Sequence, residues 1–575
     1  MNIMYYDFKV EIPAVSGKIY TKIIKDVTYI NYEYDRIYKP EKKYNIPKRT
    51  TIGKQCKDDP AMMYPNPNFM KYFPDAQLPM DNGRDERSSC LRIGAHLVIR
   101  KVVAESFLDR IIGGMYNERG TGLFLDIAAY SLVTENNAGQ YYPDYAYNHP
   151  LFTPKNKIYS DATVSEFINQ ISVDDSVKFQ NEWNAIKDHR EKIYISYDST
   201  NKNCQAGDID FVEYGHAKED KGCPVFNYSI AYDTKNREPL FYEEYPGSIV
   251  DVSQLQCMLD KAKGYGYQHA GFILDRGYFS KENIRFMDKC GYDFVIMVKG
   301  MKTFVRDLVL EVEDTFENRR SCMIKHYGVN GTTVKKKLFA SDVKSRYIHI
   351  YYSAGKCASE RSILEKKLDK MEEYLEKLKG QSVTIEKSFE RYFYLEYFHK
   401  GEEDECFVCG LPKEDVIEKE LKLCGYFYII TSEEMTSKEA LELYKSRDVS
   451  EKLFRADKTF LGNRSARVYT EESLRGKILI EFVALIIRNR IYTKIKDALQ
   501  AMNEQPNFMN VPAAIKELEK IEMIRQSDGV YRLDYAVTAN QKKILKAFGI
   551  DATYVKAKSK EISDRLNPRN MVVKI

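Results

Sequence analysis

The chain has 575 residues, of which 43% are hydrophobic and 30% are charged, and its formal net charge is +4. This balance is typical of a folded protein with a sizeable core, and it excludes a disordered chain and an integral membrane protein. The eleven cysteines are scattered, which favours reduced thiols over a disulfide framework. The longest apolar stretch, Ile478 to Ile487, contains Glu481 and is too short to span a bilayer. The first ten residues lack an apolar signal core, so we expect a cytoplasmic protein.

Charge is distributed unevenly along the chain. Residues 1–58 carry a net charge of +5 and residues 475–575 carry +8, which leaves −9 for the middle. Basic ends around an acidic centre favour a polyanion held by the flanks and a carboxylate-rich site between them. An ordinary fluctuation of charge along the sequence would also explain these numbers.

The N-terminal part divides into a strand-like segment and a helical one. In residues 1–60, Tyr, Val and Ile alternate with Lys and Arg, which predicts a basic β-rich module. Aromatic rings between cations can stack on bases and neutralise phosphates, so this module is a candidate DNA-binding domain, although ordinary surface lysines would look the same. Residues 61–187 read as a linker followed by helices, and we expect them to bind DNA or to dimerise.

The next segment, residues 188–300, changes to short apolar strands. The pattern predicts three strands, a helix, a strand, a second helix and a further strand. A helix between two strands requires a crossover connection and some parallel pairing. We therefore predict an α/β core with a mixed sheet.

Residues 301–425 interrupt this core with a predicted β-rich insertion that holds one strongly charged helix near 358–380. The leucines of that helix repeat every three or four residues, so they should pack against the insertion itself. The core resumes over residues 426–492, and residues 493–575 read as a basic helical region.

A long helix in the second part of the core carries a polar face. At about 100° per residue, Tyr444, Arg447, Glu451 and Lys458 fall within about 60° of arc. The apolar residues lie on the opposite side of the helix. The solvated face of an amphipathic helix would give the same pattern.

Two aspartates at strand ends strengthen a functional interpretation. Asp198 lies at or near the end of the first strand, and Asp275 ends the strand after the first crossover helix. In α/β sheets, ligands bind at the carboxyl ends of strands. If Glu451 joins these aspartates, the three carboxylates could share two divalent ions about 4 Å apart with a phosphodiester between them. This chemistry is two-metal phosphoryl transfer on nucleic acid.

These residues carry a family resemblance. The motifs D-S-T at Asp198, D-R-G-Y at Asp275 and Y-x2-R-x3-E-x6-K from Tyr444 to Lys458 resemble those of the DDE transposases of bacterial insertion sequences. More narrowly, the third motif is similar to the signature of the Tyr–Arg–Glu–Lys group. The resemblance implies an RNase H-like catalytic core interrupted by a β-rich insertion.

The resemblance also implies the metal ligands. Asp198, Asp275 and Glu451 would be the catalytic residues and would bind two Mg²⁺ or Mn²⁺ ions. The enzyme would cleave double-stranded DNA at the terminal inverted repeats of an element and join the freed 3′-hydroxyl ends to target DNA. It would act as a homodimer in the cytoplasm of a bacterium, in association with the nucleoid.

A second set of residues is implied to contact DNA near the cut. Tyr444, Arg447 and Lys458 belong to the signature, and Arg276 and Tyr278 follow the second aspartate. Arginine and lysine would meet phosphates. No phosphate-binding G-x-x-x-x-G-K-[ST] motif occurs, so we expect no nucleotide cofactor.

Other interpretations of the sequence stay open. The protein could be a catalytically silent DNA-binding derivative of a transposase, or an RNase H-like nuclease that never joins ends. Cys406, Cys409, Cys424 and His399 could in principle hold zinc, but the residues between the first two cysteines resemble a strand and favour a structural role. His216 follows the first strand of the core, and a structural or surface role is favoured for it.

Overall fold

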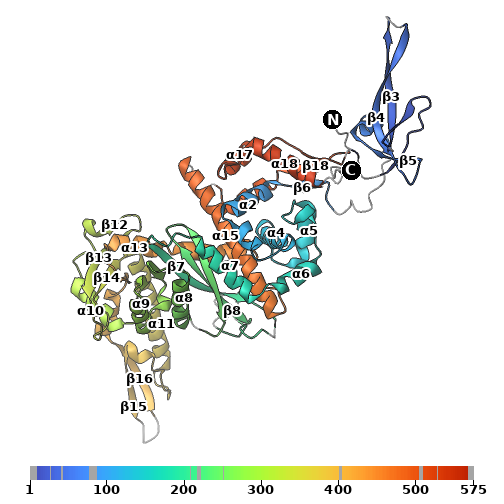
Figure 1. Cartoon of the computed structure of the whole chain (residues 1–575). Coiled ribbons are helices and arrows are strands. Elements are labelled where there is room, and N and C mark those ends of the chain that lie inside the picture. The colour runs from blue at the N-terminus through green and yellow to red at the C-terminus, as the bar shows by residue number, and fades with distance from the viewer. Residues whose placement is uncertain are drawn as a thin grey trace. The chain divides into compact units, whose positions relative to one another are not determined.

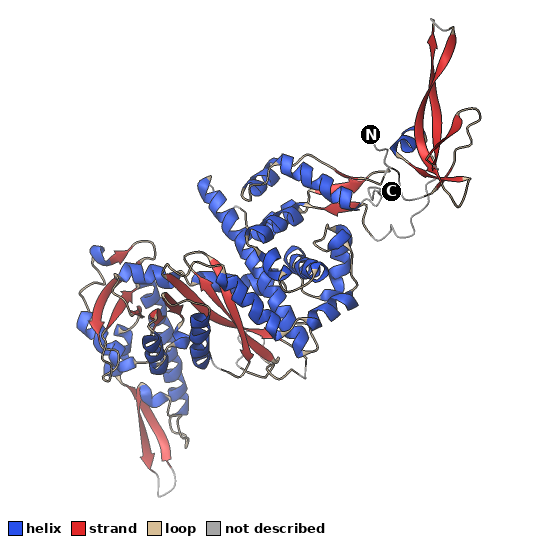
Figure 2. Ribbon diagram, in the orientation of Figure 1, coloured by secondary structure: helices blue, strands red, loops and turns tan. Residues whose placement is uncertain are grey.

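The computed structural model of the chain describes residues 5, 9–25, 27–40, 43–74, 76, 87–206, 209–215, 222–249, 251–399, 405–503, 509–527 and 529–566. By its internal contacts the chain divides into two units. The first unit is Met1–Phe179 with Asp457–Ile575, and the second is Gln180–Ala456. Figures 1 and 2 show their helices and strands.

The N-terminal part of the first unit is a five-stranded antiparallel sheet in the order β1-β5-β4-β3-β2. Val10, Ile30, Ile52, Met63 and Phe69 form its small core. The β-rich character predicted from the Tyr and Ile alternation is thus present, and the last strand and a short helix extend it beyond residue 60. The elements are β1 (Val10–Glu11), β2 (Ile19–Ile24), β3 (Val27–Lys39), β4 (Tyr44–Gln55), β5 (Met62–Pro65) and α1 (Pro67–Tyr72).

The rest of the first unit is built around one long helix. This helix, α15 (Glu471–Ala501), begins at Thr470, whose side chain accepts a hydrogen bond from the Ser473 N–H. Its apolar run is fully buried and packs against α4 and α6. Within the described part of the chain, no helix is sufficiently long and apolar to cross a membrane. The preceding helices are α2 (Gly94–Glu105), α3 (Leu108–Gly113), α4 (Glu118–Thr134), α5 (Tyr142–Asn148), α6 (Asp161–Gln170) and α7 (Val173–Ala185).

The C-terminal region contains strands that the sequence pattern did not predict. Strand β18 (Glu522–Arg525) pairs with β19 (Tyr531–Leu533) and with β6 (Cys90–Arg92) in a small antiparallel sheet. These strands are only three or four residues long, so their alternation is too brief to distinguish from helical periodicity. The other regular elements described in this region are helices. Its remaining helices are α16 (Val511–Leu518), α17 (Ala539–Lys546) and α18 (Ala552–Leu566).

The second unit is a nine-stranded mixed sheet in the order β12-β13-β14-β17-β11-β10-β7-β8-β9. Strands β7, β10 and β11 are parallel, whereas β8 and β17 are antiparallel to their neighbours. The predicted α/β class with a mixed sheet is confirmed. The strands are β7 (Ile193–Asn203), β8 (Val225–Asp233), β9 (Glu238–Pro246), β10 (Ala270–Leu274), β11 (Asp293–Met297), β12 (Met323–Ile324), β13 (Val329–Lys336), β14 (Arg346–Tyr352) and β17 (Tyr426–Thr431).

Helices cover both faces of this sheet (Figure 1). On one face, α8 (Asp251–Gly264) and α9 (Lys281–Cys290) bury their apolar side chains against the strands in one large core cluster. On the other face, α13 (Ser437–Lys445) packs Leu441 and Tyr444 against β10 and β11. Burial on both faces explains why these strands are almost continuously apolar in sequence.

The predicted insertion is only partly separate from the core. Strand β14 pairs with β17, so β12, β13 and β14 extend the main sheet. This region also holds helix α10 (Lys302–Val312), which the sequence pattern did not predict. A smaller cluster with its own core forms the remainder. Its elements are α11 (Ala354–Leu378), β15 (Phe393–His399), β16 (Glu405–Pro412) and α12 (Glu414–Lys422), of which α12 was also not predicted.

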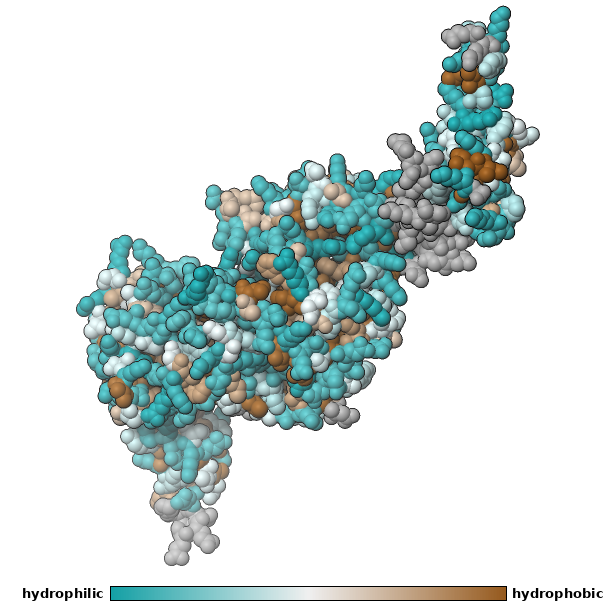
Figure 3. All heavy atoms as spheres, in the orientation of Figure 1, coloured by the Kyte–Doolittle hydropathy of each residue, from teal (hydrophilic) through white to brown (hydrophobic). Residues whose placement is uncertain are grey.

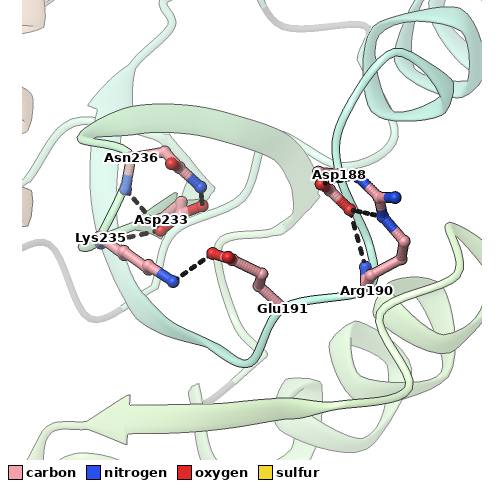
Figure 4. A network of polar contacts seen from close by, with 6 residues as sticks. All are labelled: Asp188, Arg190, Glu191, Asp233, Lys235 and Asn236. Atoms are coloured by element: carbon pink, nitrogen blue, oxygen red, sulfur yellow. Dashed lines mark hydrogen bonds and ion pairs between the residues drawn. The ribbon is translucent and has the colours of Figure 1, made fainter.

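A network of polar contacts fixes the tight turn between β8 and β9 (Figure 4). Asp233 accepts hydrogen bonds from the backbone N–H groups of Lys235 and Asn236 at 2.8 and 3.0 Å. The Lys235 ammonium pairs with Glu191, which precedes β7. Elsewhere the face of the molecule in Figure 3 is mostly hydrophilic, with hydrophobic residues in small patches.

Candidate active site

The two predicted aspartates lie on neighbouring parallel strands. Asp198 is within β7, and in the β7–β10 register Leu274 faces Tyr197, the residue before Asp198. Asp275 directly follows Leu274 and precedes a 3₁₀ helix over Arg276–Tyr278. Its side chain makes no capping hydrogen bond to that helix, although aspartate at this position usually does. The carboxylate of Asp275 therefore stays available to the site.

The third acid comes from a short helix that packs on β7. Helix α14 (Asp448–Arg455) carries Glu451, and its Leu453 and Phe454 are buried. The Ser450 and Ser196 hydroxyls form a buried hydrogen bond of 2.7 Å. Because Ser196 and Asp198 are two residues apart on the strand, they point to the same face. This bond thus holds α14 over the face from which Asp198 projects.

The three carboxylates converge on the guanidinium of Arg447. Its Nη1 lies 3.4 Å from Asp198 Oδ2, and its Nη2 lies 3.0 Å from Glu451 Oε1 and 3.8 Å from Asp275 Oδ1. The Arg447 side chain is 14% exposed, whereas that of Glu451 is 60% exposed. One partly buried cation therefore faces three acids, from β7, from the end of β10 and from α14, and its single positive charge offsets only part of their negative charge.

Tyr444 completes this arrangement. Its hydroxyl donates a hydrogen bond of 3.3 Å to Asp275 Oδ1, and its ring centroid lies 5.5 Å from Arg447 Cζ. Burial raises the pKa of Tyr444 above its ordinary value, so the phenol stays protonated and acts as a donor. Burial by itself lowers the pKa of Arg447, but Tyr444 and the three carboxylates outweigh it and raise that pKa, so the guanidinium stays charged.

The prediction of one continuous helix through the signature is wrong. Helix α13 ends at Lys445 and α14 begins at Asp448. Between them, the N–H groups of Arg447, Val449 and Ser450 bond to carbonyl groups three residues earlier, as in a 3₁₀ turn. Side chains three residues apart eclipse one another in such a turn. This geometry brings Tyr444 and Arg447 onto the same acid, and it buries Tyr444 instead of leaving it on a solvated face.

The other predicted DNA contacts differ in their surroundings. Arg276 is exposed beside Asp275. Tyr278 is 1% exposed and packs in the core, 5.5 Å from the Tyr197 ring, which argues against the predicted DNA contact. Lys458 lies in a π-helical segment, Ala456–Phe460, and belongs to the first unit. Its DNA contact stays a prediction.

The acids have the chemistry of a divalent metal site. Carboxylate oxygens are the ligands that Mg²⁺ and Mn²⁺ prefer, so the residues fit these ions. Among the residues that the structure describes, no group of three or more Asp, Glu, His or Cys side chains is already arranged around a metal position. The guanidinium of Arg447 lies between the acids instead. Asp198, Asp275 and Glu451 could therefore take up ions once this guanidinium moves.

The cysteines do not form a second metal centre in the described part of the chain. The Cys406 thiol faces the Gly380 carbonyl, and Cys409 donates to Glu396 at 3.5 Å. Cys424 donates to the Glu420 carbonyl instead. His216 and the side chain of His399 lie outside the described residues.

The hydrogen bond between the Ser196 and Ser450 hydroxyls was not predicted from the sequence. Its only signal is that Ser196 precedes Asp198 by two residues, which places it on the face of the strand that carries the acid. A serine within a strand is too common to indicate such a contact by itself.

Comparisons with known proteins show the family of the chain. The model of the transposase DDE domain family matches residues 192–487, which is more than half of the chain. The chain therefore belongs to the transposase DDE domain family. No curated protein matches the chain.

The solved structures that are similar to this chain include a piggyBac transposase in a synaptic complex with hairpin DNA. The likeness has a TM-score of 0.31 and 10% sequence identity, and it covers 71% of this chain. The present chain spans 64% of that chain, which is less than two thirds of its length.

Proposed function

We propose that this transposase cleaves double-stranded DNA at the terminal inverted repeats of its element and joins the 3′-hydroxyl ends to target DNA. Asp198, Asp275 and Glu451 are the proposed catalytic residues and the ligands of two Mg²⁺ or Mn²⁺ ions. The convergence of these three acids, which are far apart in sequence, on the single guanidinium of Arg447 carries the proposal.

The strand order supports an RNase H-like core for this chemistry. Strands β9, β8 and β7 form an antiparallel meander, and β10 and β11 continue the sheet in parallel with β7. The first acid is on β7 and the second directly follows β10, at the edge where ligands bind in such sheets. Together with the signature from Tyr444 to Lys458, this order favours the bacterial insertion-sequence group.

Each side chain of the site has a separate role in the proposed mechanism. The three carboxylates hold the ions, which when bound lower the pKa of an attacking water or hydroxyl and stabilise the leaving oxygen. The Tyr444 hydroxyl orients Asp275 through its hydrogen bond. Arg447, when displaced from the acids, is free to bind a phosphate of the substrate. Arg276 and Lys458 are proposed as further phosphate contacts.

We also propose that the active form is a homodimer that holds two DNA ends, in the bacterial cytoplasm and in association with the nucleoid. Support for this assembly comes from the resemblance of the signature to that of the insertion-sequence transposases.

A cleavage assay tests the catalytic assignment. Wild-type protein and the Asp198→Asn variant are incubated with a duplex that carries the candidate inverted repeats, in Mg²⁺ or Mn²⁺ or with chelator. We expect metal-dependent nicking by the wild type and none by the variant, with DNA binding retained. The matched control is Asp448→Asn, because Asp448 is an exposed acid on the same helix as Glu451. This variant should cleave normally. Equal cleavage by both variants would contradict the assignment.

Strand transfer requires a separate test. Duplexes with pre-cut 3′ ends are supplied together with a supercoiled target, and joined products are measured. A silent DNA-binding protein would neither nick nor join, whereas a nuclease without strand transfer would nick but yield no joined product.

A further inference from the structure

The last residue of the signature, Lys458, stands on a segment whose backbone departs from an ordinary α-helix. Residues Ala456–Phe460 form a π-helical turn. Such turns are rare, and they occur frequently at functional sites. The chain passes from the second unit to the first between Ala456 and Asp457. The three acids thus belong to the second unit, whereas the contacts that fix the backbone of Lys458 lie in the first.

The neighbour of Lys458 in this turn, Asp457, is fully buried and is held by two hydrogen bonds from Asn463. The Asn463 Nδ2 donates to Asp457 Oδ1 at 2.8 Å, and the Asn463 N–H donates to the Asp457 carbonyl oxygen at 3.2 Å. Asp457 is 0% exposed and Asn463 is 1% exposed, so water does not compete for these bonds. They close the chain from Asp457 to Asn463 into a loop.

Asn137 connects this loop to the long helix α15. Its Nδ2 lies 3.1 Å from Asn463 Oδ1 and 3.4 Å from Glu481 Oε1 on α15, and it also donates to the Ser465 carbonyl oxygen at 3.0 Å. Asn137 and Glu481 are buried as well. A chain of buried polar groups therefore runs from α15 to Asp457.

The loop also lies directly against the backbone that follows α4. Gly462 has a φ of +73°, a left-handed conformation that favours glycine. A Cβ at this position would come within 2.9 Å of the Glu135 carbonyl oxygen. The loop can approach this closely only because residue 462 has no side chain.

A buried arginine of α15 contacts the same turn. The Arg488 guanidinium carbon lies 4.9 Å from the ring centroid of Phe460, the last residue of the π-helical turn. Burial lowers the pKa of Arg488 to about 10, and the carboxylates of Glu135 and Asp457 act against this change. The guanidinium thus stays charged at neutral pH and attracts Asp457. Arg488 and Glu481 together give α15 two separate connections to the segment that carries Lys458.

We propose that Asp457 is a positioning residue, which fixes the π-helical turn so that Lys458 reaches a phosphate of the DNA substrate. The proposal rests on the proposed function, in which Lys458 contacts such a phosphate. Asp457 is buried and Lys458 is partly exposed, so the turn directs one side chain into the first unit and the next toward the surface. A side chain whose backbone is fixed in advance loses less conformational freedom on binding.

A cycle of variants of the full chain tests this role. The variants are Lys458→Ala, Asn463→Ala and their combination. Asn463→Ala removes the donor that holds Asp457 without changing the charge of the protein. The matched control is Gln541→Ala, because Gln541 is a buried amide of the same unit that donates to the Glu517 carbonyl oxygen, outside this segment. Binding to a fluorescent duplex that carries the candidate inverted repeat is measured by anisotropy over a series of salt concentrations, and thermal unfolding confirms that each variant is folded.

For Lys458→Ala, we expect the slope of log affinity against log salt to become shallower by about one, because one lysine–phosphate contact is lost. Asn463→Ala should reduce the slope by about the same amount, and the double variant should lose no more than either single variant. A role in stability alone would lower the melting temperature of Asn463→Ala but leave its slope at the wild-type value. The control should keep the wild-type slope.

An exchange of the two side chains provides a rescue. In Asp457→Asn/Asn463→Asp, the hydrogen bond persists with donor and acceptor reversed, Asn137 keeps its acceptor, and the wild-type slope should return. If Asn463→Ala does not fold, Asn137→Ala takes its place with the same expected result.

An unchanged slope in Asn463→Ala, additive losses in the double variant, or a reduced slope in the folded exchange variant would overturn the positioning role of Asp457. A wild-type protein that binds no DNA, or a Lys458→Ala variant with the wild-type slope, would overturn the proposed phosphate contact itself, and the positioning role with it.

Discussion

Two charged regions of the second unit differ in whether their charges are paired within the protein. In the active site, three carboxylates from separate elements surround the one guanidinium of Arg447. On α11, Lys366 and Lys370 lie in an open groove with no carboxylate partner among the described residues. The first region has an internal counter-charge that offsets part of its charge, whereas these two lysines have none among the described residues.

The presence or absence of an internal counter-charge determines how each region can bind ions. In the acid cluster, the guanidinium of Arg447 reduces the repulsion between the carboxylates in the absence of ligand, and it must be displaced before a metal ion is bound in its place. An unbalanced surface needs no rearrangement, and it attracts polyanions over distances set by the salt concentration. The structure therefore predicts that metal binding at the proposed site is gated by the side chain of Arg447.

The largest expected effect comes from removing the acids themselves. In the double variant Asp198→Asn/Glu451→Gln, Arg447 retains Asp275 as its only acidic partner, and the ions lose two of three ligands. We expect cleavage to fall below detection, and we expect Mn²⁺ to lose its ability to raise the melting temperature, because a ligand stabilises only the state that binds it. A melting temperature that still rises with Mn²⁺ would place the metal elsewhere.

Removing the balancing cation should change metal affinity in the opposite direction. Arg447→Ala leaves the acids without their counter-charge, so we expect Mn²⁺ to bind about tenfold more tightly in the absence of DNA, since opposite charges about 4 Å apart interact strongly in a partly buried site. Isothermal titration calorimetry measures this affinity. Cleavage should nonetheless be lost, because Arg447 is also the proposed phosphate ligand.

Arg455→Ala removes an exposed arginine from the same helix and serves as the matched control. Its metal affinity should equal that of the wild type. If Arg447→Ala binds Mn²⁺ no more tightly than this control, the guanidinium does not compete with the metal.

The smallest expected effect concerns Tyr444. Tyr444→Phe removes only the hydroxyl that donates to Asp275 at 3.3 Å, while it keeps the buried ring. We expect a loss of about 0.5–1.5 kcal/mol in the free energy of unfolding and a reduction of a few fold in cleavage. Urea denaturation measures the first quantity, and Tyr214→Phe, at an exposed tyrosine, should change neither.

The three acids that the sequence singled out lie around one guanidinium in the structure, while their catalytic and metal-binding roles stay predictions. Asp275 directly follows an apolar strand, and Glu451 belongs to a spaced motif. The prediction that Asp198 lies at or near the end of its strand is wrong, because β7 continues to Asn203. The sequence did not predict the turn between α13 and α14, because hydrogen bonds to a carbonyl three or four residues earlier differ little in residue preference. Tyr278 was assigned to the site by proximity in sequence, whereas its side chain packs into the core.

The strand pairings of the fold could not be predicted either, because local sequence patterns do not encode contacts between distant segments. The strand pattern of β14 is clear in the sequence, but nothing local shows that it pairs with β17, more than seventy residues away. Residues that look like a separate insertion therefore complete the main sheet. The three-stranded sheet of the first unit joins Cys90–Arg92 to Glu522–Arg525, a pairing that no local periodicity encodes.

The 3₁₀ turn before Glu451 also constrains which sequence changes the site can tolerate. One residue added between Arg447 and Glu451 would rotate the acid by roughly 100° about the axis of α14 and carry its carboxyl group away from Asp198 and Asp275. Substitutions on the outer surface of α14 would leave that angle intact. Among related sequences, residue types around the signature should thus vary while the number of residues between Arg447 and Glu451 stays the same.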